Sequence, residues 1–296
     1  PGWFSPHPAN FTGARELDLL LSALPPGRRI VIEGYSGGRN FGGRAITPGN
    51  ARENWEWIRE QDRLFLERTG ISAVLRRHGA EYLNVTEEVW QGRVAPAPAV
   101  RRLVEERYGI LPGQGGPAKE PAVAQEALYG VVPQRLFDLR GSVLISYQKL
   151  KSGSWSLKNL FGLIPDPLRH RWHGKDGEML GRSIVDIAAI YRGLFRVVGV
   201  VEGVFELPLY REGGRYRTDW GDYDIVTDFG LVLVGWSLVT LDYCAARIMG
   251  FEVGERSFIR IGERVFREPA QVPSHVAGAV EHHAGRLLAM SAGPRG

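Results

Sequence analysis

Val143-Leu-Ile-Ser-Tyr-Gln-Lys-Leu-Lys151 is the stretch from which the fold of this chain is inferred. Its apolar, strand-like run ends in two lysines, Lys149 and Lys151, and a helix-like turn at 154–165 then carries Lys158 and Asn159. Three ammonium groups just beyond the carboxyl end of a buried strand repel one another unless an anion lies among them. We therefore expect a carboxylate of the protein or an anionic ligand at this place, where open α/β sheets usually bind their ligands.

Strand-like and helix-like runs alternate on both sides of this stretch. The strands are expected at 29–33, 82–85, 195–201 and 229–234, and the helices at 14–24, 50–69, 73–78, 182–194 and 238–249. This βαβ alternation favours an α/β fold with a mostly parallel sheet flanked by helices.

The alternation fails between residues 91 and 127, where Pro- and Gly-rich runs surround one helix expected at 99–108. Loops of this length are seldom mere connections, so we interpret the segment as an inserted, lid-like element. The chain then divides into a first half of the α/β domain at 1–90, the insertion at 91–127, the second half at 128–265 and an irregular C-terminal tail at 266–296.

The overall composition excludes several classes of protein. The 37 basic and 33 acidic side chains leave a formal net charge of +4 without a dense basic stripe, so we expect no nucleic-acid partner. No apolar run reaches the roughly 20 residues of a membrane-spanning helix. The single cysteine, Cys244, excludes a self-contained iron–sulfur site. A cytoplasmic protein is the plain expectation.

The lysine segment suggests chemistry on an anion. In an extended chain Lys149 and Lys151 project to the same side, while Lys158 and Asn159 lie near a helix start, where free backbone N–H groups favour anions. Together they could hold a phosphate or a carboxylate, and a desolvated lysine could also act as a base or a Schiff-base nucleophile. Alternatively, the lysines pair with Asp or Glu and only organise a loop.

A glycine-rich loop follows the first expected strand, from Glu33 to Arg44. Its glycines would let the backbone approach an anion, with Glu33, Ser36, Gly37 and Arg39 as candidate binding residues. The spacing matches neither the dinucleotide-binding fingerprint nor the P-loop. A merely structural loop is the alternative.

Two carboxylates complete the candidate site. Glu202 ends a strand and could serve as general acid or base. Asp242 lies in an otherwise apolar helix, where it could help bind substrate or anchor the helix by pairing with Arg247 or a lysine. No spacing typical of a metal site is present, so we expect no metal.

The second half of the chain resembles the family catalogued as "domain of unknown function 362". The resemblance rests chiefly on Leu157-Lys-Asn-Leu-Phe-Gly-Leu-Ile-Pro165 and Leu241-Asp-Tyr-Cys-Ala-Ala-Arg-Ile-Met-Gly-Phe251, within roughly 141–252. It implies a Rossmann-like α/β domain, often found beside ferredoxin-type iron–sulfur modules. The chain has Ser152 and Gly153 where the family commonly has a histidine, and Trp236-Ser237 where Asp-Pro is common. These differences leave a divergent or lost activity open.

The preferred hypothesis is an enzyme or enzyme-like protein that binds a small anionic substrate, with the reaction class and any cofactor unknown. The rival hypothesis is a non-catalytic accessory protein for an iron–sulfur or redox partner. The candidate catalytic residues are Lys149, Lys151, Lys158 and Glu202, and the candidate binding residues are Glu33, Ser36, Gly37, Arg39, Asn159 and Asp242.

Overall fold

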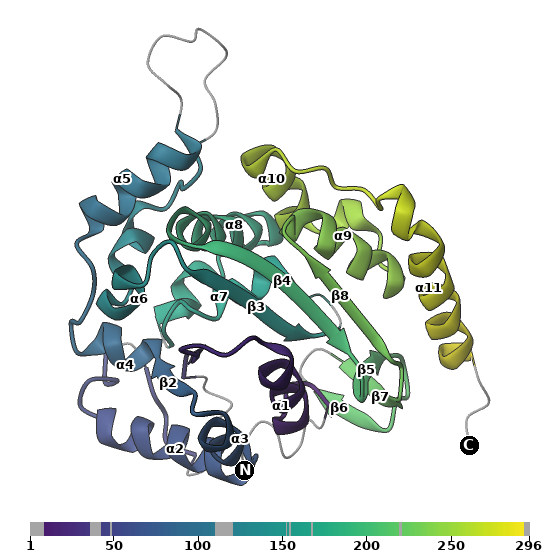
Figure 1. Ribbon diagram of the computed structural model, residues 1–296, viewed down its shortest axis with the longest axis horizontal. Helices are drawn as coiled ribbons and strands as arrows, with labels where there is room; N and C mark the ends of the chain where they lie inside the picture. The colour runs from purple at the N-terminus through teal and green to yellow at the C-terminus, as the bar shows by residue number, and fades with distance from the viewer. Residues whose placement is uncertain are drawn as a thin grey trace, which may run out of the picture.

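The computed structural model describes residues 9–35, 43–47, 49–109, 121–151, 153, 155–166, 168–218 and 221–292. Helices pack around three small sheets, and two of the sheets contain parallel strands (Figure 1). The predicted mixed α/β class is therefore confirmed.

The central sheet has the strand order β3 (Val143–Lys149), β4 (Arg196–Gly203) and β8 (Leu231–Gly235). These strands are rich in Val, Leu and Ile, which pack well on a pleated surface. β3 and β4 run parallel, and β4 and β8 run antiparallel. Lys149 lies directly opposite Glu202 in this register.

Two further sheets lie beside the central one. β1 (Ile30–Glu33) and β2 (Glu81–Asn84) form a parallel pair. β5 (Glu206–Tyr210), β7 (Gly221–Thr227) and β6 (Tyr216–Thr218) form an antiparallel sheet.

We expected one mostly parallel sheet. The described residues form three separate sheets instead, and three of their five strand pairings are antiparallel. The physical reason lies in the connection between β4 and β8. Parallel neighbours need a crossover, usually helical, whereas the β5–β7 sheet joins these two strands and brings the chain back in the opposite direction.

Eleven α-helices of the described residues surround the sheets (Figure 1). They are α1 (Ala14–Ala23), α2 (Trp55–Arg68), α3 (Ile71–His78), α4 (Val85–Trp90), α5 (Ala97–Tyr108), α6 (Gln134–Asp138), α7 (Ser156–Phe161), α8 (Gly177–Leu194), α9 (Leu238–Ile248), α10 (Ser257–Phe266) and α11 (Ala277–Ala292). None of the described helices is both long enough and apolar enough to cross a membrane.

The expected irregular tail at 266–296 is a wrong prediction, because α11 occupies much of it and packs beside α9 (Figure 1). Val280 and Leu287, two turns apart on α11, are both buried. Glycine and histidine weaken the intrinsic helix preference of this stretch, so tertiary packing stabilises the helix.

The described part of the segment 91–127 is built into the core. Val100 and Val104 of α5 are buried, and a Cβ added to Gly193 of α8 would lie 2.8 Å from Val104 Cγ2. Residues 110–120 lie outside the described residues. The lid role of this segment stays a prediction.

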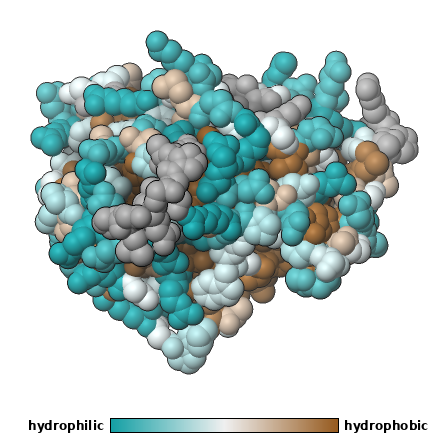
Figure 2. Space-filling model, turned by 90° about the horizontal axis from the view of Figure 1, so that it is seen from above, coloured by the Kyte–Doolittle hydropathy of each residue, from teal (hydrophilic) through white to brown (hydrophobic). Residues whose placement is uncertain are grey.

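One face of the central sheet is open towards the start of β3. Val143, Val232, Val234 and Trp236 are four of the eight most exposed large apolar side chains of the described residues. The register of the strands and their alternation place them on the same face. A doubly wound sheet is covered by helices on both faces, and this topology is not seen here. On the side of α5, α8 and α10, apolar patches interrupt a mostly hydrophilic surface (Figure 2).

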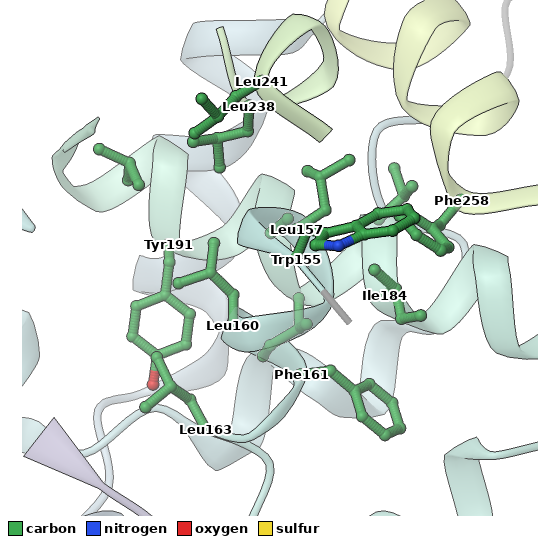
Figure 3. Close-up of a cluster of buried hydrophobic side chains, with 14 of the residues drawn as sticks. Trp155, Leu157, Leu160, Phe161, Leu163, Ile184, Tyr191, Leu238, Leu241 and Phe258 are labelled. Carbon is green, nitrogen blue, oxygen red and sulfur yellow. The ribbon is translucent and has the colours of Figure 1, made fainter. Parts of the chain in front are cut away.

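The opposite face of the sheet carries the core. Leu157 and Leu160 of α7 pack among Tyr191 of α8, Leu238 of α9 and the rest of a buried apolar cluster (Figure 3). α7, which follows the lysine-bearing strand, is therefore held between the sheet and two longer helices, α8 and α9.

We expect Gly199→Ala to lower the free energy of unfolding by about 1–3 kcal/mol, because the extra methyl group overpacks this interface. A Cβ at Gly199 would lie 2.4 Å from Leu241 Cδ2 and 2.8 Å from Ser156 Oγ. Denaturant unfolding followed by circular dichroism measures the effect. The matched control is Gly27→Ala, whose Cβ would meet nothing within 4 Å. Equal stability of the two variants would contradict this packing.

Candidate functional site

The candidate residues lie around the carboxyl end of β3. Alternation along the strand places Tyr147 and Lys149 on the same face as exposed Val143, but at an end where both contact Glu16 of α1. Ser146 and Gln148 lie on the opposite, helix-covered face. Lys151 follows the strand, and α7 returns Lys158 and Asn159 to the same region.

Lys149 is the centre of a buried ion-pair cluster. Its Nζ lies 2.8 Å from Glu16 Oε1 and 3.2 Å from Glu202 Oε1, and it donates a hydrogen bond to the backbone oxygen of Glu206 at 2.8 Å. Lys149 and Glu202 are each 1% exposed, and Glu16 is 4% exposed. Burial raises the pKa of Glu202, although the Lys149 ammonium opposes this shift. This lysine is matched by carboxylates of the protein.

Lys151 has a different environment. Its Nζ donates a hydrogen bond to the backbone oxygen of Asn10 at 2.7 Å and makes no ion pair with any described carboxylate. Burial, followed by the positive charge of Lys158, lowers its pKa to about 8, while Glu33 acts in the opposite direction. Lys151, Lys158 and Glu33 are thus electrostatic neighbours.

Lys158 is half-buried on α7 and has no hydrogen-bond or ion-pair partner among the residues described. Burial and the neighbouring Arg256 lower its pKa. The charge of Lys158 in turn contributes to lowering the pKa of His173, after burial. Arg256 and Lys151 therefore place positive charge near Lys158, and no described carboxylate pairs with it.

Asn159 braces α7 against β3. Its Nδ2 donates hydrogen bonds to Ser146 Oγ at 3.1 Å and to the backbone oxygen of Tyr147 at 3.4 Å. Ser146 Oγ donates in turn to the backbone oxygen of Ser156. The amide group of this candidate binding residue is thus engaged in holding the lysine-bearing helix.

Asp242 closes the amino-terminal end of α7. The N–H groups of Ser156 and Leu157 donate to its Oδ1 and Oδ2 at 2.7 and 3.0 Å. Asp242 is fully buried, and burial raises its pKa to about 7, although these N–H groups favour the ionised form. Two of the backbone donors that we expected to favour an external anion are therefore occupied by a carboxylate of the protein. Asp242 also does not form the alternative ion pair with Arg247 that we considered, because the Arg247 guanidinium contacts Glu281 instead.

The start of the glycine-rich loop meets the far end of the lysine segment. A Cβ added to Gly34 would lie 2.7 Å from the backbone oxygen of Gly162, and Arg169 donates to the backbone oxygen of Tyr35 at 3.4 Å. Glu33 accepts a hydrogen bond from the N–H of Gly34. The candidates Ser36, Gly37 and Arg39 lie outside the described residues.

Sequence reasoning did not find three neighbours of the lysines: Glu16, Asn10 and Arg256. Glu16 had a detectable signal, since it is an acidic residue on the apolar stripe of an amphipathic helix. Asn10 acts through its backbone, and Arg256 lies in a connection, so neither carries a sequence signal.

Two hollows of the described surface lie away from the lysines. One of about 280 Å³ is bordered by Tyr243, Arg247 and Arg260, and one of about 230 Å³ by Gln125, Trp172 and Met179. Neither is lined by a lysine. No group of three or more His, Cys, Asp or Glu side chains in the described part of the chain could hold a metal ion.

Comparison with known proteins points to one family. No curated protein and no solved structure matches the chain. The sequence model of a family described as "Domain of unknown function (DUF362)" matches residues 142–247, which run from β3 through α9. Over this segment, which carries the lysines, Glu202 and Asp242, the chain resembles the DUF362 family.

Proposed function

We propose that this protein binds a small anion bearing a phosphate or carboxylate group through Lys158 and Lys151, as an enzyme or enzyme-like protein. The observation that carries the proposal is the difference between the lysines. Lys149 contacts two carboxylates, whereas the half-buried Lys158 has no described partner and Lys151 has only a backbone oxygen.

Electrostatics supports this difference in role. Removing an ammonium group from water without a counter-charge is unfavourable, and a second cation nearby increases that cost. A bound anion would interact favourably with both Lys151 and Lys158.

The other candidates take supporting roles in this proposal. Lys149 and Glu202 join β3 to β4 as a buried ion pair. Asp242 and Asn159 fix the position of α7 and hence of Lys158. Glu202 stays a candidate general acid or base, in addition to its structural role in the ion pair with Lys149.

Isothermal titration with a panel of phosphorylated and carboxylated metabolites tests the proposal. We expect wild type to bind at least one of them and Lys158→Ala to bind it roughly tenfold to hundredfold more weakly, as for the loss of one charge-assisted hydrogen bond. Lys175→Ala is the matched control, because Lys175 is an exposed lysine outside the site. Absence of binding by wild type, or equal binding by Lys158→Ala, would refute the proposal.

A further inference from the structure

We propose that the anion is a small 2-oxo carboxylate and that the amine of Lys151 condenses with its carbonyl carbon to form a Schiff base. This inference rests on the proposed function, since Lys158 is taken to hold the carboxylate. It adds a covalent step and a substrate class.

The contacts of Lys151 suit a nucleophile better than the contacts of Lys149, the last residue of β3. Lys149 Nζ is within 3.2 Å of two carboxylate oxygens, which favour the charged ammonium. Lys151 Nζ instead donates to the neutral backbone oxygen of Asn10. An uncharged amine can keep this hydrogen bond and still present its lone pair elsewhere, so the contact positions the nitrogen without blocking it.

The surroundings also favour loss of the proton. Burial disfavours the ammonium form, and the positive charge of Lys158 adds to this effect, so the pKa of Lys151 falls to about 8 although Glu33 opposes the shift. At neutral pH about a tenth of such an amine is uncharged, against less than one part in a thousand for an unperturbed lysine. A desolvated lysine beside another cation is a known way to activate an amine towards carbonyl compounds.

The use of basic residues in the chain is consistent with amine chemistry at this place. Only five of the 37 basic residues are lysines, and three of these five are Lys149, Lys151 and Lys158. Arginine carries the positive charge nearly everywhere else, and a guanidinium does not lose its proton in proteins. A lysine, whose amine can lose its proton, therefore occupies position 151, where the Schiff base requires such an amine.

The step needs no reactant other than one proton from the solvent. The neutral Nζ attacks the carbonyl carbon, and a proton passes from nitrogen to the carbonyl oxygen. The resulting carbinolamine takes up one proton from the solvent and loses water as its C–O bond breaks. The product is a protonated imine whose positive charge lies beside the carboxylate held by Lys158. Addition of water reverses the reaction, and nothing is oxidised or reduced.

Reductive trapping tests the inference with pyruvate as the probe and sodium cyanoborohydride, which reduces the imine to a stable secondary amine. Intact-mass analysis and peptide mapping of wild type then locate the adduct. We expect it on Lys151 and in higher yield near pH 8.5 than near pH 7. A wild-type adduct on another lysine, equal labelling of exposed Lys175, or the absence of any adduct would overturn the inference.

Two variants separate this inference from the proposed function. Lys151→Arg keeps the charge but removes the nucleophile, so we expect it to bind pyruvate in titration and to form no adduct. Lys158→Ala should reduce both binding and trapping. If wild type binds pyruvate or another carboxylate without forming an adduct, only the Schiff base is refuted. If it binds no anion at all, the proposed function fails as well.

Discussion

Lys149→Met is expected to lower the free energy of unfolding by about 3–5 kcal/mol, the range found when one partner of a buried ion pair is removed. The substitution would leave Glu16 and Glu202 facing each other in the interior, each almost without solvent exposure. Chemical denaturation followed by circular dichroism measures the loss. Lys175→Met, a change at an exposed lysine, should alter stability by no more than about 0.5 kcal/mol.

The destabilisation of Lys149→Met should depend on pH. Without the ammonium, the pKa of the Glu202 carboxyl should rise beyond its already raised position, so the folded state would bind more protons than the unfolded state. The stability of the variant should therefore increase as the pH falls towards about 5. The triple variant Lys149→Met, Glu16→Gln, Glu202→Gln should recover much of the loss, because no buried charge remains. A loss below about 1 kcal/mol for the single variant would show that the cluster is not buried as described.

Asp242→Ala is expected to lower the free energy of unfolding by about 2–4 kcal/mol, because it leaves the buried N–H groups of Ser156 and Leu157 without their acceptor. Anion binding should weaken as well, because α7 carries Lys158. Denaturation and titration on the same preparation measure both effects. If Asp242→Ala matched wild type in stability, the carboxylate would not be the cap of α7.

Asp242 should also give wild type a specific pH dependence. Burial raises its pKa from an ordinary 3.8 to about 7, so between these values the folded state holds a proton that the unfolded state releases. The contribution of this group to stability is thus full at acidic pH and is lost as the pH rises through about 7. Asp242→Asn cannot titrate, and the difference in stability between wild type and this variant should change between about pH 5 and pH 8. A constant difference across this range would contradict the raised pKa.

The local elements could be read from periodicity. Alternating or continuous apolar runs predicted β1, β2, β3, β4 and β8. Helical spacing predicted α1, α5 and α9 within a few residues of their observed bounds, and α8 with a start five residues too late. Strand pairing could not be read in the same way. Whether β8 returns parallel or antiparallel to β4 depends on a connection that forms its own sheet, and no local pattern reports this.

In the candidate site, too, the local sequence predicted some features and not others. That Lys149, Lys151 and Lys158 would need an anion followed from their number and spacing, and a protein carboxylate was one of the expected answers. Which lysine has which partner depended on residues far away in the sequence. Glu16 reaches Lys149 across 133 positions, and Asp242 reaches Ser156 across 86.

The sequence by itself therefore determined the mixed α/β class, most of its elements, and a concentration of amines at the end of one buried strand. Only the tertiary structure decided which amine is neutralised by the protein, because charge pairing depends on distances of a few ångströms between segments remote in the chain. It matched Lys149 with two carboxylates and placed Asp242 at the start of α7. It left Lys158 with no partner among the described residues, and that difference carries the proposed chemistry.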